Sequence, residues 1–246
     1  MSKNLIVDGS NAAAASFFVI RKDYPSDKDI IEAELEIDSK ELIEKVVNNF
    51  NTMISGMENT FQTDNVYIAW EGKDGTKWRK EILPEYKANR GEKPLFMIDC
   101  LNACRTQNLY PNFSIDNAEG DDTVYALCKY FHEKGDENII CSSDKDFLQV
   151  AQEGYCTLYN FIKREFRELP VHNSISEKAL TGDSSDNLKG LPKIGPVKAK
   201  KLLDNNLKDL TREQVEIYDK HCQVIGLKNN PYCEAIYNDV KSLLEG

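Results

Sequence analysis

Short apolar runs alternate with longer amphipathic stretches along the first two thirds of this chain of 246 residues. Such an alternation predicts strands separated by helices, and therefore an α/β fold with a mainly parallel central sheet flanked by helices. The expected strands are residues 5–7, 66–70, 113–115, 138–141, 155–159 and 165–169. The expected helices are residues 12–20, 36–57, 77–89 (interrupted at Pro84), 95–107, 121–134 and a segment that begins near residue 145.

The chain beyond about Val171 shows helical patterns only, and no linker separates it from the rest. We therefore expect an α/β core over residues 1–172 and a helical region over residues 173–246. The apolar patch at residues 12–20 is too short to cross a bilayer, and no cationic stretch precedes a long apolar run at the N-terminus. These features predict a cytoplasmic protein that does not associate with membranes.

The chain contains seven Cys and three His. The Cys count is odd, no CxxC pair occurs, and the His residues lie far apart in the sequence. This pattern is typical neither of a disulfide framework nor of a zinc site, so we expect reduced, structural thiols.

The formal net charge of −10 is unusual for a protein that binds nucleic acid, because such proteins are usually basic. The charge is unevenly distributed, however. Residues 73–93 contain seven basic and four acidic residues, and residues 187–203 contain five Lys and no acidic residue. The excess of acid must therefore lie in other segments, and its position is informative.

Several carboxylates follow expected strands at the point where each strand ends. Asp8 follows the first strand, Glu71 the second, and Asp144 and Asp146 follow the strand at residues 138–141. Because the carboxyl ends of parallel strands meet at one edge of a sheet, these side chains are expected to converge. Five further acidic residues lie at expected helix starts or turns, and the last two would share a face if helical: Glu119, Asp121, Asp122, Asp183 and Asp186.

Nine carboxylates in one place would repel one another strongly. Two unit charges about 4 Å apart cost roughly 4 kcal/mol at an effective dielectric constant near 20. Such a cluster requires cations, and oxygen ligands favour Mg²⁺ or Mn²⁺, with two ions forming the arrangement that hydrolyses phosphodiesters. A single Asp after a strand is more often a turn or cap residue, and an acidic pair with a strand-end Asp also occurs in phosphoacceptor receiver domains. The number of converging segments favours the metal site.

Two segments are candidates for phosphate binding. Residues 183–203 read DSSDNLKGLPKIGPVKAKKLL, where Gly195 and Pro196 predict a helix start whose free N–H groups suit a phosphate. Residues 78–90 read WRKEILPEYKANR, in which Lys87 and Arg90 would share a helical face. Tyr86 and Trp78 could stack on bases. The alternatives are an ordinary turn with a solvated Lys face, and a Trp78 that belongs to the core.

These segments together resemble the motifs of the flap endonuclease and 5′-3′ exonuclease family, which includes bacteriophage 5′-nucleases and the 5′-nuclease domain of bacterial DNA polymerase I. The matching motifs occur in family order between residues 5 and 203: VDGSN, LPEYKANR, AEGDD, SSDKDFLQV and GDSSDNLKGLPKIGPVKAKKLL. The resemblance implies a PIN-like nuclease core with a short arch region at about residues 73–110. It also implies a DNA-binding helix–three-turn–helix in the C-terminal region.

The resemblance also implies roles for individual residues. The first metal ion would be surrounded by Asp8, Glu71, Glu119 and Asp121, and the second region would be completed by Asp122, Asp144, Asp146, Asp183 and Asp186. Asp121 would act in catalysis together with Lys87 and Arg90, which would contact the scissile phosphate. The expected DNA contacts are Arg79, Tyr86, Lys87, Arg90, Gly190, Lys193, Gly195, Lys198 and Lys200, with a potassium ion as a candidate at the helix–three-turn–helix.

The activity implied is that of a Mg²⁺-dependent 5′-3′ exonuclease or flap endonuclease in replication, repair or recombination. Its substrates would be DNA with 5′ ends or 5′ flaps, with RNA primers on DNA as a further candidate. A monomer is expected, located in the host cytoplasm if the chain is phage-encoded. Two other functions stay open: a non-catalytic binder of DNA junctions on the same fold, and an RNA-directed nuclease of the PIN-like type.

The sequence departs from the family pattern at several positions. Glu71 stands where Asp is usual, Gly120 replaces Ala, and Lys189 replaces Pro. Only 28 residues, 91–118, separate Arg90 from Glu119, which is a short arch region for this family. We therefore expect threading of 5′ flaps to be weakened in favour of exonuclease action on 5′ ends.

Overall fold

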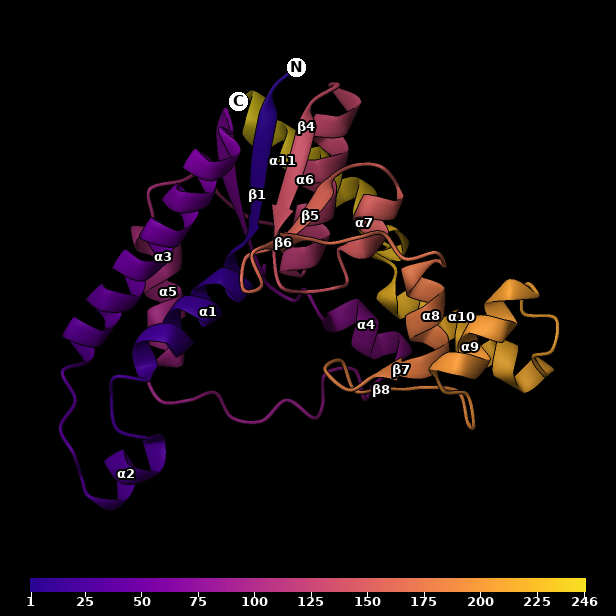
Figure 1. Ribbon diagram of the computed structural model, residues 1–246, viewed down its shortest axis with the longest axis horizontal. Helices are drawn as coiled ribbons and strands as arrows, with labels where there is room; N and C mark the ends of the chain where they lie inside the picture. The colour runs from indigo at the N-terminus through magenta and orange to yellow at the C-terminus, as the bar shows by residue number, and fades with distance from the viewer.

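A six-stranded sheet lies at the centre of the molecule in the computed structural model, which describes residues 1–246 (Figure 1). The strand order is β3-β2-β1-β4-β5-β6; the first five are parallel, and β6 runs antiparallel to β5. The strands are β1 (Lys3–Asp8), β2 (Asn65–Trp70), β3 (Asn112–Ser114), β4 (Glu137–Cys141), β5 (Thr157–Asn160) and β6 (Glu165–Phe166). The predicted mainly parallel α/β fold is confirmed.

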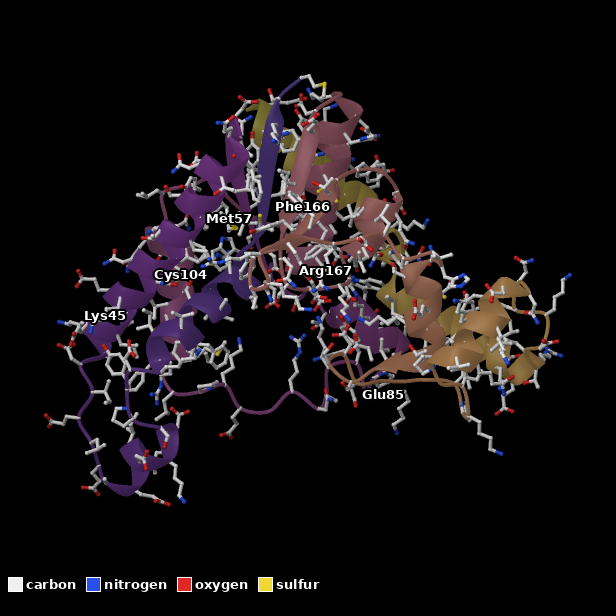
Figure 2. The ribbon with its side chains drawn as sticks, viewed as in Figure 1. Lys45, Met57, Glu85, Cys104, Phe166 and Arg167 are labelled. Atoms are coloured by element: carbon white, nitrogen blue, oxygen red, sulfur yellow. The ribbon has the colours of Figure 1, made fainter.

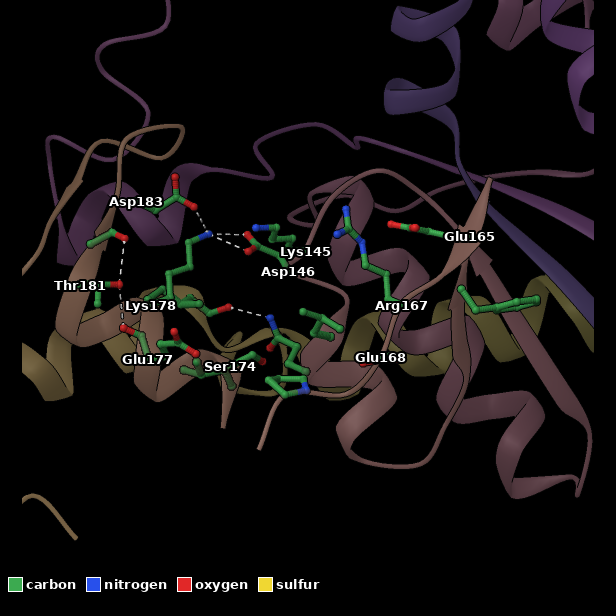
Figure 3. Close-up of a pocket in the computed structure, with 17 residues that line it drawn as sticks. Lys145, Asp146, Glu165, Arg167, Glu168, Ser174, Glu177, Lys178, Thr181 and Asp183 are labelled. Atoms are coloured by element: carbon green, nitrogen blue, oxygen red, sulfur yellow. Dashed lines mark hydrogen bonds and ion pairs between the residues drawn. The ribbon is translucent and has the colours of Figure 1, made fainter. Parts of the chain in front are cut away.

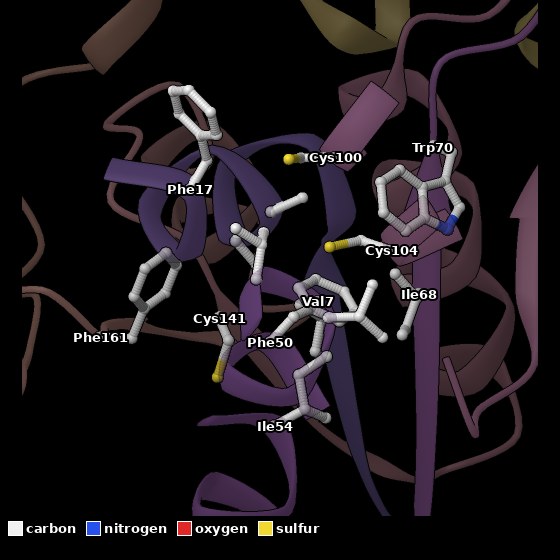
Figure 4. Close-up of a cluster of buried hydrophobic side chains, with 14 of the residues drawn as sticks. Val7, Phe17, Phe50, Ile54, Ile68, Trp70, Cys100, Cys104, Cys141 and Phe161 are labelled. Atoms are coloured by element: carbon white, nitrogen blue, oxygen red, sulfur yellow. The ribbon is translucent and has the colours of Figure 1, made fainter. Parts of the chain in front are cut away.

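Helices cover both faces of this sheet, because residues 4–8 of β1 are all buried although successive side chains point to opposite faces. Leu5 and Val7 face a core formed with α1 (Gly9–Arg21), α3 (Ser39–Phe61) and α5 (Met97–Gln107). Figure 4 shows part of this core, in which Phe50 and Trp70 pack near Val7. Ile6 faces the opposite core, formed with α6 (Gly120–Glu133) and α11 (Cys233–Glu245).

The C-terminal region consists mainly of short helices beside the sheet (Figure 1). Its elements are α8 (Ser174–Thr181), β7 (Gly182–Asp183), β8 (Leu188–Lys189), α9 (Pro196–Asp204), α10 (Arg212–Ile225), the 3-10 turn η1 (Leu227–Asn229) and α11. This region was expected to contain helices only, but it also contains the antiparallel hairpin β7–β8. Gly190 permits it, because a Cβ at this position would lie 2.3 Å from the Thr181 carbonyl oxygen.

The helix expected over residues 77–89 is much shorter in the structure. Helix α4 spans Lys77–Ile82 and ends before Pro84, which lacks an N–H group and disfavours helical conformation in the residue before it. The following residues, 83–96, form turns and coil that we call the strap, and they lead to α5 (Figure 1). Lys87 within the strap has a left-handed backbone with φ of 56°. The prediction that Lys87 and Arg90 share a helical face is therefore wrong.

Two short helices complete the fold. Helix α2 (Asp27–Glu32) lies outside the main cores, and α7 (Leu148–Gln152) begins slightly later than expected. Figure 2 shows Lys45 on the outer surface of α3, whereas Met57 and Cys104 are buried. None of the helices combines the length and the apolar character needed to cross a membrane.

A close backbone contact fixes the chain where β2 ends. The N–H of Gly72 donates to the carbonyl oxygen of Ala118 at 2.9 Å, and a Cβ at Gly72 would lie 1.7 Å from the carbonyl oxygen of Ile115. This contact holds the residue after Glu71 against the segment that leads to Glu119.

We predict that Gly72→Ala lowers the free energy of unfolding by about 2 kcal/mol or more, because two backbone segments must separate to admit the methyl group. Gly56→Ala is the matched control, since no atom lies within 4 Å of the position of its Cβ. Gly56 is inside α3, so the control should stabilise by ~0.5–1 kcal/mol. Urea denaturation of both variants measures the difference, and equal stabilities would contradict the prediction.

Candidate metal centre

The carboxyl ends of β1 and β4 place two of the predicted carboxylates side by side. Asp8 is the last residue of β1 and caps α1, where it accepts a hydrogen bond from the Asn11 N–H at 3.1 Å. Its other oxygen accepts from the Ser142 hydroxyl at 2.9 Å. Asn11 in turn accepts from the Ser143 N–H at 2.9 Å. These bonds tie the end of β1 to the segment that carries Asp144. Asn11 and Ser142 were not predicted as site residues.

Three of the predicted metal ligands form one compact group. One carboxylate oxygen from each of Asp121, Asp144 and Asp146 lies within 4.8 Å of the others. Asp121 is in the first turn of α6, where the helix dipole favours negative charge. Asp144 and Asp146 lie in the segment after β4, so two distant parts of the sequence supply this group as predicted.

The pKa values in this group show that negative charge is crowded. Burial, with smaller contributions from the charges of Asp144 and Glu71, raises the pKa of Asp8 to about 6, against hydrogen bonds that lower it. Burial, followed by the charges of Asp8 and Asp144, raises the pKa of Asp121 well above its ordinary value. Carboxylates that resist ionisation without a cation, and that offer oxygen ligands only, fit divalent metal ions.

Lys87 brings positive charge to the same place. Its ammonium pairs with Glu119 and lies 3.9 Å from an oxygen of Asp186. The strap is fixed at this point, since the N–H of Lys87 donates to the Asp186 carbonyl at 2.9 Å and Asn89 donates to the Ser184 carbonyl at 2.7 Å. Lys87 therefore points into the carboxylate site although the expected helix is absent, and its catalytic role stays a prediction.

Behind the site, Arg79 lies in a buried ion-pair network. Its guanidinium donates to both oxygens of Asp122 at 2.8 Å, pairs with Glu119 at 3.0 Å, and donates to the carbonyl of Val224 at 3.1 Å. Only 2% of Arg79 is exposed, so the prediction that it contacts DNA is wrong. The prediction that Asp122 joins the second metal region is also wrong, because both its oxygens face Arg79.

Two aromatic residues of the same segment are also buried. Tyr86 is 4% exposed, and its hydroxyl donates to Glu119 at 2.9 Å. It cannot stack on a base in this position, so that prediction is wrong. Trp78 is 3% exposed, which agrees with the alternative that it belongs to the core.

A second group of carboxylates surrounds Lys178 of α8 (Figure 3). The Lys178 ammonium lies 2.7 Å from both oxygens of Asp146, 2.7 Å from Asp183 and 3.2 Å from Asp186. Burial would raise the pKa of Asp183, but hydrogen bonds from Lys178 and Ser185 outweigh this effect and lower the pKa to about 2.

The expected helical arrangement of this second pair is wrong. Asp183 ends β7 and Asp186 lies in the turn of the β7–β8 hairpin, yet both reach the same ammonium. Sequence reasoning missed Lys178 because a single Lys in an amphipathic helix gives no signal of its partners.

The predicted phosphate-binding residues around the start of α9 (Pro196–Asp204) make no ion pair with the carboxylates of the site. Gly195 is the N-cap of α9 and Pro196 its first residue, as predicted, while Lys193, Lys198 and Lys200 are exposed. Gly190 serves the close contact with α8 described above. The basic side chains therefore form an exposed surface at the start of α9, and their DNA contacts stay predictions.

Comparisons with known proteins agree with this arrangement. Residues 3–179 match the family model described as 5′-3′ exonuclease, N-terminal resolvase-like domain. The chain is 34% identical over 152 residues to the flap endonuclease Xni of Shewanella woodyi, covering 58% of this chain and 60% of the relative. It is 30% identical over 177 residues to a 5′-3′ exonuclease of Mycoplasmopsis pulmonis, covering 66% of this chain and 58% of the relative. The chain thus spans about three fifths of the length of these relatives.

Solved structures show the same fold. The 5′-exonuclease of bacteriophage T5 with bound zinc ions superposes with a TM-score of 0.70 at 19% identity, covering 99% of this chain and 98% of the other. The bacteriophage T5 flap endonuclease in a pseudo-enzyme–product complex with DNA and metal ions superposes with a TM-score of 0.74 at 16% identity. That comparison covers 99% of this chain and 100% of the other.

We predict that divalent metal binding weakens as the pH falls through about 6. The pKa values of Asp8 and Asp146 are both raised to about 6, so at pH 5 protons compete with the ion for these oxygens. At about pH 7.5 and above, both groups are almost fully ionised and the affinity should be nearly constant. Titration calorimetry with Mn²⁺ should show an affinity roughly tenfold or more lower at pH 5 than at pH 7.5. An affinity that is unchanged between these pH values would contradict the raised pKa values.

Proposed function

The chain belongs to the 5′-3′ exonuclease family, and on this premise we propose that it is a structure-dependent 5′-nuclease that hydrolyses DNA phosphodiesters with divalent metal ions. The observation that carries the proposal is the convergence of Asp121, Asp144 and Asp146 beside Asp8 at the carboxyl edge of the sheet. A protein that only bound DNA would gain nothing from this cluster, because the carboxylates repel phosphate.

The residues fit a metal site built from two neighbouring groups. Asp8, Asp121 and Asp144, with Glu71 at the side, would hold a first Mg²⁺ or Mn²⁺ ion, while Glu119 stays paired with Arg79 and Lys87. Asp146, Asp183 and Asp186 would hold a second. Bound ions of this kind activate water and stabilise the leaving oxygen of a phosphodiester.

The basic residues of the strap would orient the reacting phosphate. The Lys87 ammonium lies among the carboxylates, where it can donate to a phosphate oxygen once the strand enters. Arg90 is more open, with 54% of its side chain exposed and its guanidinium 3.7 Å from Asp186. Together they would stabilise negative charge that develops on the phosphate during cleavage.

The start of α9 would grip the duplex away from the cleaved bond. The free N–H groups after Gly195 and the exposed ammonium groups of Lys193, Lys198 and Lys200 suit backbone phosphates. The turn between β8 and α9 is also the place proposed for a potassium ion. These contacts would not depend on base sequence, which suits an enzyme that recognises the shape of DNA ends.

The names of the relatives support DNA with 5′ ends or 5′ flaps as the substrate, and RNA primers annealed to DNA belong to the proposal as well. We place the activity in replication, repair or recombination, in a monomer of the cytoplasm.

We predict that Asp121→Ala abolishes cleavage while DNA binding survives, because the carboxylate serves the metal ions and not the duplex. Lys87→Ala should lower the cleavage rate by ~10²-fold or more, with a much smaller change in affinity. Labelled 5′-flap, nicked, blunt and single-stranded substrates, with Mg²⁺ and then with EDTA, provide the measurement.

Two exposed residues outside the site provide matched controls: Asp99→Ala on α5 and Lys80→Ala on α4 should retain wild-type rates. Binding without Mg²⁺-dependent cleavage of any substrate by the wild-type protein would leave a binding function instead.

The conformation of the strap affects whether a 5′ flap must thread through the protein to reach the site. The strap contains no helix, so no helical arch encloses the site in this structure. We predict that a bulky protein block on the end of a 5′ flap slows cleavage only slightly relative to a free flap. Paired time courses on free and blocked flaps measure this ratio, and strong inhibition by the block would show that threading is required.

A further inference from the structure

Lys178 occupies the centre of the second carboxylate group. Its ammonium contacts Asp146, Asp183 and Asp186 at 2.7–3.2 Å, and 13% of its side chain is exposed. Asp183 and Asp186 come from the β7–β8 hairpin directly after α8, whereas Asp146 comes from the distant segment after β4. The ammonium is the group that these three carboxylates share.

A divalent ion and this ammonium cannot occupy the group together. Mg²⁺ binds carboxylate oxygens at about 2.0–2.1 Å, which places the ion in the space between the same oxygens. The Lys178 nitrogen already lies 2.7 Å from both oxygens of Asp146. An ion bound to Asp146 and Asp183 would therefore approach the ammonium closely, and the two positive charges would repel each other.

We propose that Lys178 is a resident cation of the second carboxylate group, which holds Asp146, Asp183 and Asp186 together without metal and is displaced when a divalent ion binds there. The inference rests on the proposed function, because it assumes that this group receives a divalent ion.

The structure provides a place for the displaced ammonium. A cavity of about 640 Å³ adjoins the group, and Lys178 lines it together with Glu165, Glu168 and Glu177 (Figure 3). Rotation of the flexible Lys side chain into this cavity would keep the charge in a polar environment. The displacement therefore requires no movement of α8, whose Ala179 and Leu180 are fully buried.

The inference has a consequence for the order of metal binding. Asp8, Asp121 and Asp144 have no ammonium or guanidinium group within 4.0 Å, so a first ion can bind there without displacing a charge. The second ion must displace Lys178, and its affinity is lower for that reason. Lys178 thus makes the affinity of the second metal position lower than that of the first.

Titration of the full-length, metal-stripped protein with Mn²⁺ tests the proposal, with calorimetry for affinity and thermal denaturation in EDTA for stability. Lys178→Met removes the charge but keeps most of the side-chain volume. Lys178→Arg keeps the charge. Lys145→Met is the matched control, because Lys145 lines the same cavity but makes no ion pair.

In EDTA, Lys178→Met should unfold at a midpoint several degrees lower than wild type, since three carboxylates lose their shared cation, and Mn²⁺ should restore the midpoint. The second, weaker Mn²⁺ position of Lys178→Met should bind Mn²⁺ at least ~10-fold more tightly than the same position of wild type. This difference corresponds to about 1.4 kcal/mol. Lys178→Arg should resemble wild type in both measurements, and Lys145→Met should change the affinity at most about twofold.

The proposal is overturned if Lys178→Met behaves as Lys145→Met does, or if it binds Mn²⁺ more weakly than wild type. A variant that folds only with Mn²⁺ supports it. Should wild type bind Mn²⁺ and cleave DNA while both Met variants behave alike, this inference fails and the proposed function stands. A wild-type protein that binds no Mn²⁺ would refute both.

Discussion

Mutual repulsion of carboxylates at the carboxyl edge of the sheet is the constraint around which this protein is built. The fold brings Asp8 and Asp144 together, because Asp8 ends β1 and Asp144 follows the end of the neighbouring parallel strand β4. Three largely buried positive groups offset this repulsion from different sides: Arg79 from behind, Lys87 from the strap and Lys178 from α8. The charge of the site thus depends on these three groups and on the divalent ions that its carboxylates would bind.

The parts of the site that follow from chain direction could be predicted from the sequence. Asp8 and Asp144 are close because parallel strands align their ends, and this geometry needs no knowledge of side-chain packing. The same holds for Asp121, which the first turn of α6 directs toward the sheet edge. Gly195 and Pro196 begin α9 for purely local reasons, so that boundary was predictable as well.

The parts that depend on tertiary partners could not be predicted. The sequence shows that Arg79 is basic, but its burial follows from Asp122 and from the carbonyl of Val224, which is 145 residues away. Tyr86 was predicted to contact DNA because it is an aromatic residue beside basic ones. Its burial also follows from a tertiary partner, since its hydroxyl donates to Glu119. Lys178 gave no signal at all, since its three partners are brought to it by the hairpin and by the segment after β4.

The contact between Arg79 and Val224 also bears on how the molecule unfolds. The guanidinium that neutralises Asp122 is held by a carbonyl near the end of α10, and Gln149 bonds both Ile225 and Leu227. Beyond these bonds, α11 returns to pack on α6 and completes one face of the sheet. Removal of the last helices would take away the Val224 carbonyl that Arg79 bonds. It would also expose the apolar surface of α6 that α11 covers. We therefore expect the two regions to unfold together, with the C-terminal helices behaving as part of the core.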